Sequence, residues 1–535
     1  MPARINIAGR LRPQSELSDA QRARGLKILL WEGVTSSASG GFTSGAFLTS
    51  FALLLGAAKF HIGLIAAIPA AMQLVQIGAI IVVERLQMRK IIVWPAYLLS
   101  YSTWAVIAFL PLLFAIPSNY AVYTLLAVLV ARGVLDAVVT CGWNSWFRAI
   151  VPLDIAGRFL SKRFVWNTIG VVLAGFAAAA YVNRLEHWFS GKAIVWGYSA
   201  AIVFAAVMLG WLAVYFMYHI PEPRMPDPGP KRLSPGSILT APFRIANARW
   251  LMGFLFLWAI TSTMAVPFFA VYMLTRLEMP ASTVLALTVA TQIALVLSLG
   301  IWGQICDQFG PKVALSMAFS MLMVAIVGWV FTTRPGSYFL TAPVLVGLHI
   351  LLGMASAGMN VSSTTIRMKT APELQTTSYM MGTSLSYHVG AAIGPVIGGA
   401  LATLFTGKQI LLEFRWHEPD SVFNMPVLYV QDFDFLFIIA FVTGLAALRV
   451  LRQVTDGKES ARSAVLESLA SKTAASYRPL AGKPVIGVAS RLHPGAVRRM
   501  VPIPGLDTAA GILAYLSGQA ISLIVGIRDR LRRKR

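Results

Sequence analysis

Charged side chains are scarce in this sequence of 535 residues. Asp, Glu, Lys and Arg together make up 13% of it, whereas a soluble domain of ordinary composition carries about 25%. Hydrophobic residues reach 57%, and the mean hydropathy is +0.68. So little charge over such a length excludes a water-soluble globular protein. The composition predicts a protein that crosses a membrane many times.

Cysteine is almost absent, and so are the motifs of common enzymes. The two cysteines, Cys141 and Cys306, are too few for a disulfide framework. The sequence contains no HExxH, no GxSxG and no paired spacing of metal ligands, so we predict no enzyme, no metal and no cofactor. It also lacks GxxxxGK followed by Ser or Thr, the phosphate-binding loop that an ATP-driven pump requires.

Acidic residues are half as frequent as basic ones, and the formal net charge is +23. In a soluble protein this excess would indicate a nucleic-acid partner. Here the basic residues lie between hydrophobic stretches, so the positive-inside rule of membrane proteins explains them. We therefore predict no nucleic-acid partner.

Twelve apolar stretches are each long enough to cross a bilayer, which takes about twenty apolar residues of helix. They form two sets of six, at 28–218 and 250–451, on either side of a proline-rich linker at 219–249. The fold class we expect is all-α and integral to the membrane, with twelve transmembrane helices in two six-helix halves. The predicted spans are 28–55, 62–83, 91–115, 119–147, 164–182 and 194–218, then 250–274, 282–305, 312–332, 338–361, 379–405 and 431–451.

The distribution of Lys and Arg orients these spans. With the N-terminal segment 1–27 inside the cell, inside segments before the last span carry 21 of these residues, and outside loops carry 7. This bias predicts that both termini are cytoplasmic. The basic tail 452–535 contains an apolar stripe near 507–531, which we assign to an interfacial helix. A thirteenth span is the alternative for that stretch.

The two halves also repeat each other in sequence. In the loops after the second and the eighth span, an acid is followed five residues later by a base. Further matches in each half are offset by nearly the same number of residues, 223 or 220. Offsets this regular indicate structural repeats. The matched pairs are Glu84 with Asp307, Arg89 with Lys312, Pro152 with Pro372, and Gly170 with Gly390.

This organisation resembles the major facilitator superfamily. The loop after the eighth span, GQICDQFGPK, is similar to that family's loop signature of a glycine, an acid, a second glycine and a base, here Gly303, Asp307, Gly310 and Lys312. The resemblance implies two six-helix domains that rock about a central cavity. It also implies that the first and fourth helices of each half line this cavity, with a small molecule as substrate and a monomer as the working unit.

Polar residues on those four helices predict the cavity independently. They recur at helical spacing within apolar spans, and polar side chains turn away from lipid. The third and sixth spans, by contrast, are aromatic and aliphatic and carry no charge. A contact between neighbouring helices is the alternative role for any single Ser or Thr. The candidate cavity residues are Ser36, Ser39, Thr43, Thr140, Asn144, Thr261, Thr263, Ser356 and Asn360.

Two ionisable residues lie together in the fourth span. Arg132 and Asp136 are four residues apart, so both project from one face of a helix. A charge near the bilayer centre costs about 2.5–3.5 kcal/mol, which confines such a pair to a bundle interior or a cavity. The pair either neutralises itself and holds the fold, or couples transport to protons. In the second case Asp136 exchanges the proton and Arg132 tunes its affinity.

Glu32 and His388 are further candidates for proton coupling. Glu32 lies about one turn inside the cytoplasmic edge of the first span, where it either pairs with Arg24 or Lys27 or forms a second protonatable site. His388 lies in the middle of the eleventh span, and a histidine changes charge near neutral pH. A hydrogen-bonded structural histidine is the alternative.

The resemblance also implies a cytoplasmic gate, in which loop charges and helix dipoles latch the two halves together. Orientation under the positive-inside rule is the alternative role for these charges, and it is the one we assign to Lys162 and Arg163. The gate candidates are Glu84, Arg85, Arg89, Arg148, Arg158, Gly303, Asp307, Gly310 and Lys312.

Together these features predict a secondary transporter in a bacterial inner membrane. We expect it to move a small organic solute by alternating access, coupled to protons. An uncoupled facilitator is one alternative. A membrane sensor or scaffold that does not transport is the other.

Overall fold

The computed structural model describes residues 14, 17–76, 78–79, 88–152, 156–224, 240–332, 340–372, 376–418, 421–456 and 512. Several predictions lie outside this part of the chain, among them Glu84 and Arg85, most of the linker and the helix near 507–531. The side chains of Arg148 and Arg158 also lie outside the description.

Helices dominate the described residues, because backbone groups inside a bilayer must find their hydrogen bonds within their own segment. The first half contains α2 (Asp19–Thr43), α3 (Gly45–Leu55), α4 (Lys59–Met72), η1 (Gln73–Val75), α6 (Arg89–Ala108), α7 (Leu110–Leu113), α8 (Asn119–Ile150), α9 (Ala156–Trp188), α10 (Lys192–Phe204), η2 (Ala205–Gly210) and α11 (Trp211–His219). The second half contains η3 (Ala241–Arg244), α13 (Ala246–Thr275), α14 (Ala281–Phe309), α15 (Pro311–Gly328), η4 (Trp329–Phe331), α16 (Thr341–Thr370), α17 (Thr376–Leu404) and α18 (Phe433–Leu451).

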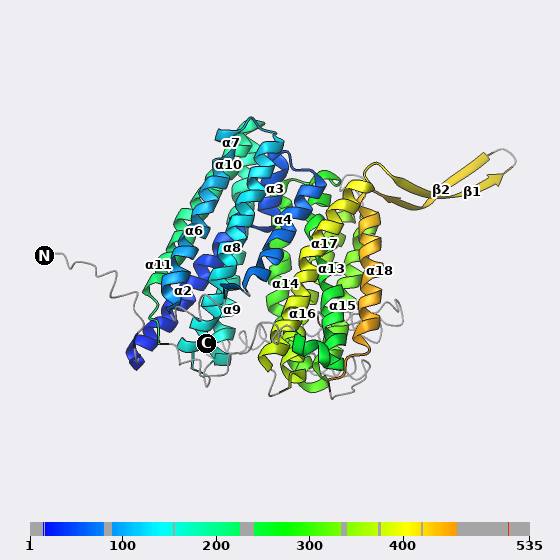
Figure 1. The fold of residues 1–535 in the computed structure, drawn as a ribbon. Coiled ribbons are helices and arrows are strands. Elements are labelled where there is room, and N and C mark those ends of the chain that lie inside the picture. Colours follow the sequence, from blue (N-terminus) through cyan, green and yellow to red (C-terminus); the bar gives the residue numbers. More distant parts are fainter. Residues whose placement is uncertain are drawn as a thin grey trace, which may run out of the picture. The chain divides into compact units, whose positions relative to one another are not determined.

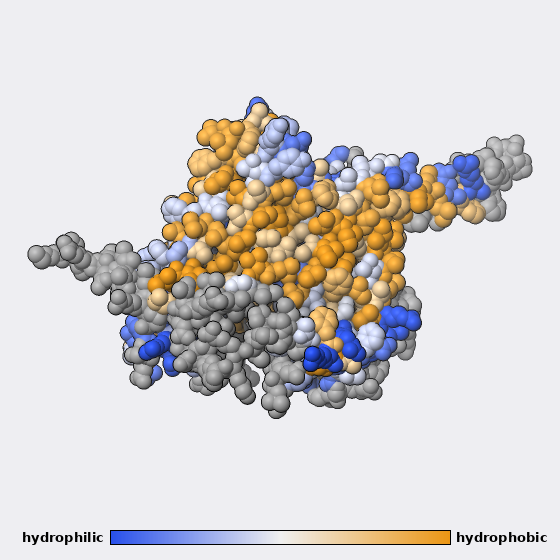
Figure 2. Space-filling model, in the orientation of Figure 1, coloured by the Kyte–Doolittle hydropathy of each residue, from blue (hydrophilic) through white to orange (hydrophobic). Residues whose placement is uncertain are grey.

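Within the described residues, eleven helical segments are long and apolar enough to cross a membrane. The segment Lys59–Val75 is apolar but shorter, and residues 80–87 beyond it are not described. Figure 2 shows hydrophobic side chains over the visible sides of the helices. The chain is therefore a multi-pass membrane protein. Each predicted span overlaps a described helix, while the arrangement as two six-helix repeats stays a prediction.

The first span is interrupted at Ser44. This residue has an extended backbone, with φ −145° and ψ 178°, and α3 begins at Gly45. Gly45 has φ +57°, a left-handed conformation that glycine adopts without steric cost. The Ser44 hydroxyl donates to the carbonyl of Gly40 at 2.7 Å. Helices α2 and α3 are thus two pieces of one span, joined at a single non-helical residue.

The chain divides into two units by its internal contacts. Unit 1 comprises Met1–Ser234, Ala259–Val289 and Tyr387–Leu436. In it, α2 packs against α9 and α6 packs against α8. Unit 2 comprises Pro235–Trp258, Ala290–Ser386 and Phe437–Arg535, and α15 packs against α16 there.

A β-hairpin connects α17 to α18. Strands β1 (Gln409–Glu418) and β2 (Ser421–Gln431) pair antiparallel, with an irregular register between Leu412 and Glu413. Figure 1 shows the hairpin extending away from the ends of the two helices. The expectation of an exclusively helical chain is wrong here, because β-branched and aromatic residues are frequent in this loop and favour extended backbone.

Near the hairpin, helices from both predicted halves meet within unit 1. Glu186, in the last turn of α9, accepts hydrogen bonds from the backbone N–H of Ala281 (2.8 Å) and from the hydroxyl of Ser282 (3.0 Å), at the start of α14. Lys59, at the start of α4, donates to the Thr406 hydroxyl oxygen (3.0 Å), just beyond α17. We call these hydrogen bonds the hairpin-end contacts.

The residues that follow α11 fasten the opposite end of the first half. The buried carboxylate of Glu222 accepts the backbone N–H groups of Arg89 (2.6 Å) and Lys90 (3.2 Å), at the start of α6. The indole N–H of Trp146 donates to the carbonyl of Pro221 at 2.9 Å. Burial raises the pKa of Glu222 above its usual value, and the two backbone N–H groups oppose this effect. An acid from the linker thus complements the positive end of the α6 dipole.

Candidate functional site

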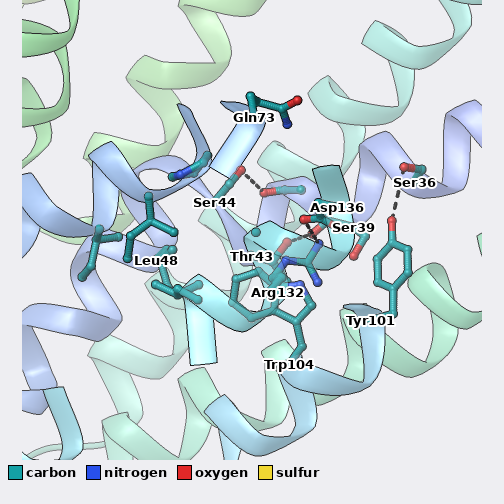
Figure 3. A pocket seen from close by; sticks show the side chains of 16 residues that line it. Ser36, Ser39, Thr43, Ser44, Leu48, Gln73, Tyr101, Trp104, Arg132 and Asp136 are labelled. Atoms are coloured by element: carbon teal, nitrogen blue, oxygen red, sulfur yellow. Dashed lines mark hydrogen bonds and ion pairs between the residues drawn. The ribbon is translucent and has the colours of Figure 1, made fainter. Parts of the chain in front are cut away.

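A cavity of about 310 Å³ lies among α2, α3, α4, α6 and α8, within unit 1. Figure 3 shows polar side chains from several helices converging on it. From α2 come the hydroxyl groups of Ser36, Ser39 and Thr43, and η1 contributes Gln73. This volume lies at the lower end of the range for small-molecule sites, about 300–1,000 Å³.

Arg132 and Asp136 form the charged centre of the cavity. Both lie on α8, and Nη2 of the arginine is 3.3 Å from Oδ2 of the aspartate. Ser100 on α6 contacts both partners: its carbonyl accepts Nη1 of Arg132 at 2.5 Å, and its hydroxyl donates to the Asp136 carboxylate. The side chain of Arg132 is 16% exposed and that of Asp136 is 35% exposed. The pair therefore borders open space and is not sealed in the core.

Helix α6 forms a wall of this cavity, although its span had no charge to mark it in the sequence. Tyr101 and Trp104 both belong to the lining. The Arg132 guanidinium lies 5.5 Å from the ring centroid of Tyr101 and 4.8 Å from that of Trp104, distances at which cations are attracted to aromatic faces. Sequence polarity alone missed these residues, because aromatic rings can face either lipid or a cation.

A second acid–base pair lies beside the cavity. Glu32 on α2 is 3% exposed, and its Oε2 accepts Nη2 of Arg163 at 2.8 Å. Its Oε1 accepts the hydroxyl of Tyr97 at 2.9 Å. The partner expected for a structural role was Arg24 or Lys27, nearer the start of the same helix. The structure corrects this expectation, and it also corrects the assignment of Arg163 to orientation alone, because helix packing brings α9 against α2.

The other polar residues predicted on α2 and α8 divide into two groups. Ser36, Ser39 and Thr43 line the cavity. Thr140 and Asn144 are not part of the lining. The Thr140 hydroxyl donates to the backbone carbonyl of Asp136 at 2.7 Å. The side chain of Asn144 is exposed on the surface, outside this cavity. A stripe at helical spacing continues past the end of the cavity because the helix is longer than the cavity.

The candidates from the second half do not belong to this lining. Thr261 is completely buried, and its hydroxyl has no hydrogen-bond partner among the described residues. The Thr263 hydroxyl donates to a carbonyl of its own helix at 2.7 Å. Ser356 and His388 are half-buried, and Asn360 is exposed. Their part in binding or coupling stays a prediction.

In the first half, the described gate candidate is Arg89. Its side chain is 2% exposed, and two of its guanidinium nitrogens have no hydrogen-bond partner among the described residues. Its backbone N–H binds Glu222, as described above. This acid lies 133 residues further along the chain, so the loop pattern of acid and base could not identify it.

In the second half, the gate candidates lie around the turn between α14 and α15. Gly303 and Asp307 lie near the end of α14, and Gly310, with φ +94°, precedes α15. The backbone N–H of Lys312 donates to Oδ2 of Asp456 at 2.9 Å, beyond the end of α18. This hydrogen bond stays within unit 2, and a latch between the halves stays a prediction.

The described residues offer no cluster of three or more His, Cys, Asp or Glu side chains that could hold a metal ion. Neither cysteine forms a disulfide in the described part of the chain, and Sγ of Cys306 lies 3.3 Å from the hydroxyl oxygen of Ser362. The chemistry available in the cavity is therefore that of one ion pair, hydroxyl groups, an amide and aromatic rings.

Comparison with known proteins identifies both a family and a fold. A family model described as Major Facilitator Superfamily matches residues 30–383, which is more than half of the chain. No curated protein sequence matches.

Three solved structures resemble the chain at low sequence identity. A mutant of the nucleoside transporter NupG has a TM-score of 0.61 at 14% identity, over 81% of this chain and 99% of that one. A bacterial homologue of the human lysosomal transporter Spinster has a TM-score of 0.54 at 14% identity, over 95% and 97%. The E. coli fucose:proton symporter FucP has a TM-score of 0.50 at 15% identity, over 81% and 99%. At these identities the likeness concerns the fold.

Proposed function

The chain belongs to the major facilitator superfamily, and on that premise we propose that it is a proton-coupled secondary transporter of a small organic solute. The observation that carries the proposal is the Arg132–Asp136 pair in the lining of a cavity among membrane-length helices of the first half. Intramembrane ionisable residues usually serve function, since an idle charge there is costly. Asp136 is the proton-exchanging group in this proposal, and Arg132 tunes its affinity for the proton.

The cavity favours a neutral, hydroxyl-bearing solute. Among the described residues that line it, the one cation and the one anion already pair with each other, so neither charge is left uncompensated to hold an ionic ligand. The hydroxyl groups of α2 and the amide of Gln73 both donate and accept hydrogen bonds, while Tyr101 and Trp104 offer flat apolar surfaces. The solved structures with this fold include transporters of a nucleoside and of fucose, and both are small solutes rich in hydroxyl groups.

The hairpin-end contacts support alternating access. Glu186 places an acid at the positive start of α14, and Lys59 places a cation beyond the negative end of α17, so both charges complement helix dipoles. At the same end, α4 passes α17 closely, and a Cβ added to Gly63 would lie 3.1 Å from Cα of Gly399. Contacts of a few hydrogen bonds close one side of a cavity reversibly, which alternating access requires.

The decisive experiment compares the unmodified chain with Asp136→Asn in proteoliposomes. A thermal-shift screen of the purified chain against neutral sugars, nucleosides and other small metabolites first supplies a solute. We expect the unmodified chain to accumulate that solute when a pH gradient is imposed. Asp136→Asn is expected to bind it and to exchange it across the membrane, but to lose the accumulation that the pH gradient drives, because an amide cannot carry the proton.

The matched control is Thr140→Ala, which removes a hydroxyl one turn away on the same helix face and is expected to leave accumulation unchanged. If Asp136→Asn accumulates solute like the unmodified chain, the assignment of Asp136 is wrong. If the unmodified chain equilibrates the solute but ignores the pH gradient, it is an uncoupled facilitator.

A further inference from the structure

The β-hairpin carries a row of exposed apolar side chains that the proposed function does not use. Ile410, Leu412 and Phe414 are 57%, 57% and 50% exposed. They occupy every second position of β1, so they share one face of the strand. The irregular register after Leu412 passes over residue 427 of β2, so the alternation along β1 continues through it. We call this row the apolar hairpin face. A sheet face that meets water is normally polar, so this one calls for an apolar partner.

The other face of the hairpin is polar. The Tyr429 hydroxyl donates to Oε1 of Gln409 across the two strands at 2.9 Å. Glu413 and Arg415 follow on the same face of β1, and they pair with each other at 3.2 Å. Leu411, opposite Tyr429 in the register, is an apolar exception on this face. The hairpin thus has one side suited to water and one side suited to an apolar environment.

The hairpin begins and ends where membrane-length helices end. Helix α17 ends at Leu404, five residues before β1, and α18 begins at Phe433, two residues after β2. Figure 1 shows the strands extending sideways from the end of α17. Figure 2 shows hydrophobic side chains on the hairpin as well as on the helices. Beside the end of a helix that crosses a bilayer lies the layer of lipid headgroups. This position brings the apolar hairpin face to the lipid surface.

The edges of the hairpin do not favour pairing with a strand of another chain. Pro426 in β2 has no N–H group to donate, and the ladder is irregular beside it. The edge strand β1 carries Glu413 and Arg415. Prolines, irregular registers and charges are the features by which proteins prevent pairing at the edge of a sheet. A lipid surface requires no such pairing. Apolar side chains can enter the boundary of the acyl chains while the backbone groups of the edges stay among headgroups and water.

We propose that the apolar hairpin face binds the lipid surface of the membrane that the chain crosses, with Ile410, Leu412 and Phe414 inserted at the headgroup boundary. The contact is apolar, because Glu413 and Arg415 neutralise each other on the opposite face. Binding therefore needs no anionic lipid. The hairpin fixes the depth at which α17 ends and α18 begins, and it does so whether or not a solute or a proton is bound.

The test places a nitroxide label on each face of the hairpin, in the full-length chain with Cys141 and Cys306 replaced by serine. The chain is reconstituted in liposomes of phosphatidylcholine alone. Leu412→Cys carries the label on the apolar hairpin face, and Glu413→Cys, the next residue, is the matched control on the polar face. Spin relaxation then compares the access of oxygen, which concentrates in lipid, with that of a water-soluble nickel complex present on both sides of the membrane. We expect oxygen to dominate at Leu412→Cys and the nickel complex to dominate at Glu413→Cys.

A second variant removes the apolar contact around the same label. With Ile410→Ser and Phe414→Ser added, the label at Leu412→Cys should become as accessible to the nickel complex as the label at Glu413→Cys. Nickel access that is already equal at the two positions, before these serines are added, would refute the proposal. Protection of the Leu412→Cys label from both reagents would also refute it, since protein would then cover this face. Dipolar broadening between labels would identify that protein as a second copy of the chain.

Discussion

The two halves of the chain place their charges differently. In the first half, the structure describes two ion pairs inside membrane-length helices, Arg132–Asp136 and Glu32–Arg163. In the second half, the described ion pairs lie beyond the helices, where Arg276 contacts Asp432 at 3.5 Å and Arg415 contacts Glu413 at 3.2 Å. The membrane-embedded charge chemistry of the described residues is therefore concentrated in the first half.

The second half uses its polar groups for packing. The indole of Trp302 is completely buried and donates to the carbonyl of Met354 at 2.9 Å. The buried hydroxyls of Ser298 and Thr383 donate to carbonyls of their own helices. These side chains are buried against other helices, so their polar groups do not border open space. The comparison of the two halves shows that a polar side chain inside a membrane is evidence for function only where it borders a cavity.

Separating the charges of the first half tests this comparison most strongly. Breaking a fully buried ion pair costs about 3–5 kcal/mol, and the partial exposure of this pair reduces the expected loss for Arg132→Met to about 2 kcal/mol. The double variant Arg132→Met with Asp136→Leu should recover most of that stability, because no charge is left unpaired, yet it should not transport. Thermal unfolding in detergent gives the stabilities. Equal stability of the unmodified chain and the two variants would show that the pair is not desolvated.

The hairpin-end contacts, which join the two halves, allow a second test. Glu186→Ala removes two hydrogen bonds at the start of α14, and losing a helix cap costs about 0.5–2 kcal/mol. We expect this end of unit 1 to open more often, so that maleimide labels the buried Val289→Cys faster once both native cysteines are replaced by serine. Glu413→Ala, an exposed acid on the hairpin, is the control. Unchanged labelling of Glu186→Ala would mean that Glu186 does not hold this end closed.

The smallest expected effect comes from the second half. Thr261 is completely buried with an unsatisfied hydroxyl, so Thr261→Val removes a desolvated polar group of similar volume. We expect the unfolding free energy to rise by about 1 kcal/mol while solute binding stays unchanged. Thermal unfolding and thermal-shift titration with the solute measure the two quantities. Weaker solute binding would place a binding residue in the second half and end the asymmetry.

The sequence allowed prediction of features that local geometry decides. The apolar stretches gave the positions of the helices, since length and hydropathy suffice for that. The contact of Arg132 with Asp136 follows from a spacing of four residues on a helix. Ser36, Ser39 and Thr43 were identified as cavity residues in the same way, because they form one stripe.

Contacts between helices could not be predicted, because a single sequence does not determine which helices pack together. Glu32 lies 131 residues from Arg163, and no spacing rule connects them. Tyr101 and Trp104 could not be assigned to the cavity from sequence, since aromatic residues are frequent on both faces of a membrane helix. The contact of Glu222 with the start of α6 is equally unpredictable, because the prolines around Glu222 indicate only a linker.

The joint at Ser44 fixes the rotation of the first span about its own axis. A continuous helix turns in the membrane at little cost, because all its backbone groups are bonded within the segment. At the joint the helical ladder is interrupted, and each unbonded backbone group exposed to hydrocarbon costs several kcal/mol. Ser44 itself lines the cavity. The non-helical backbone at Ser44 therefore keeps the same side of the span turned toward the cavity. We therefore expect that substituting a single hydroxyl of α2 alters the lining of the cavity without turning the helix that bears it.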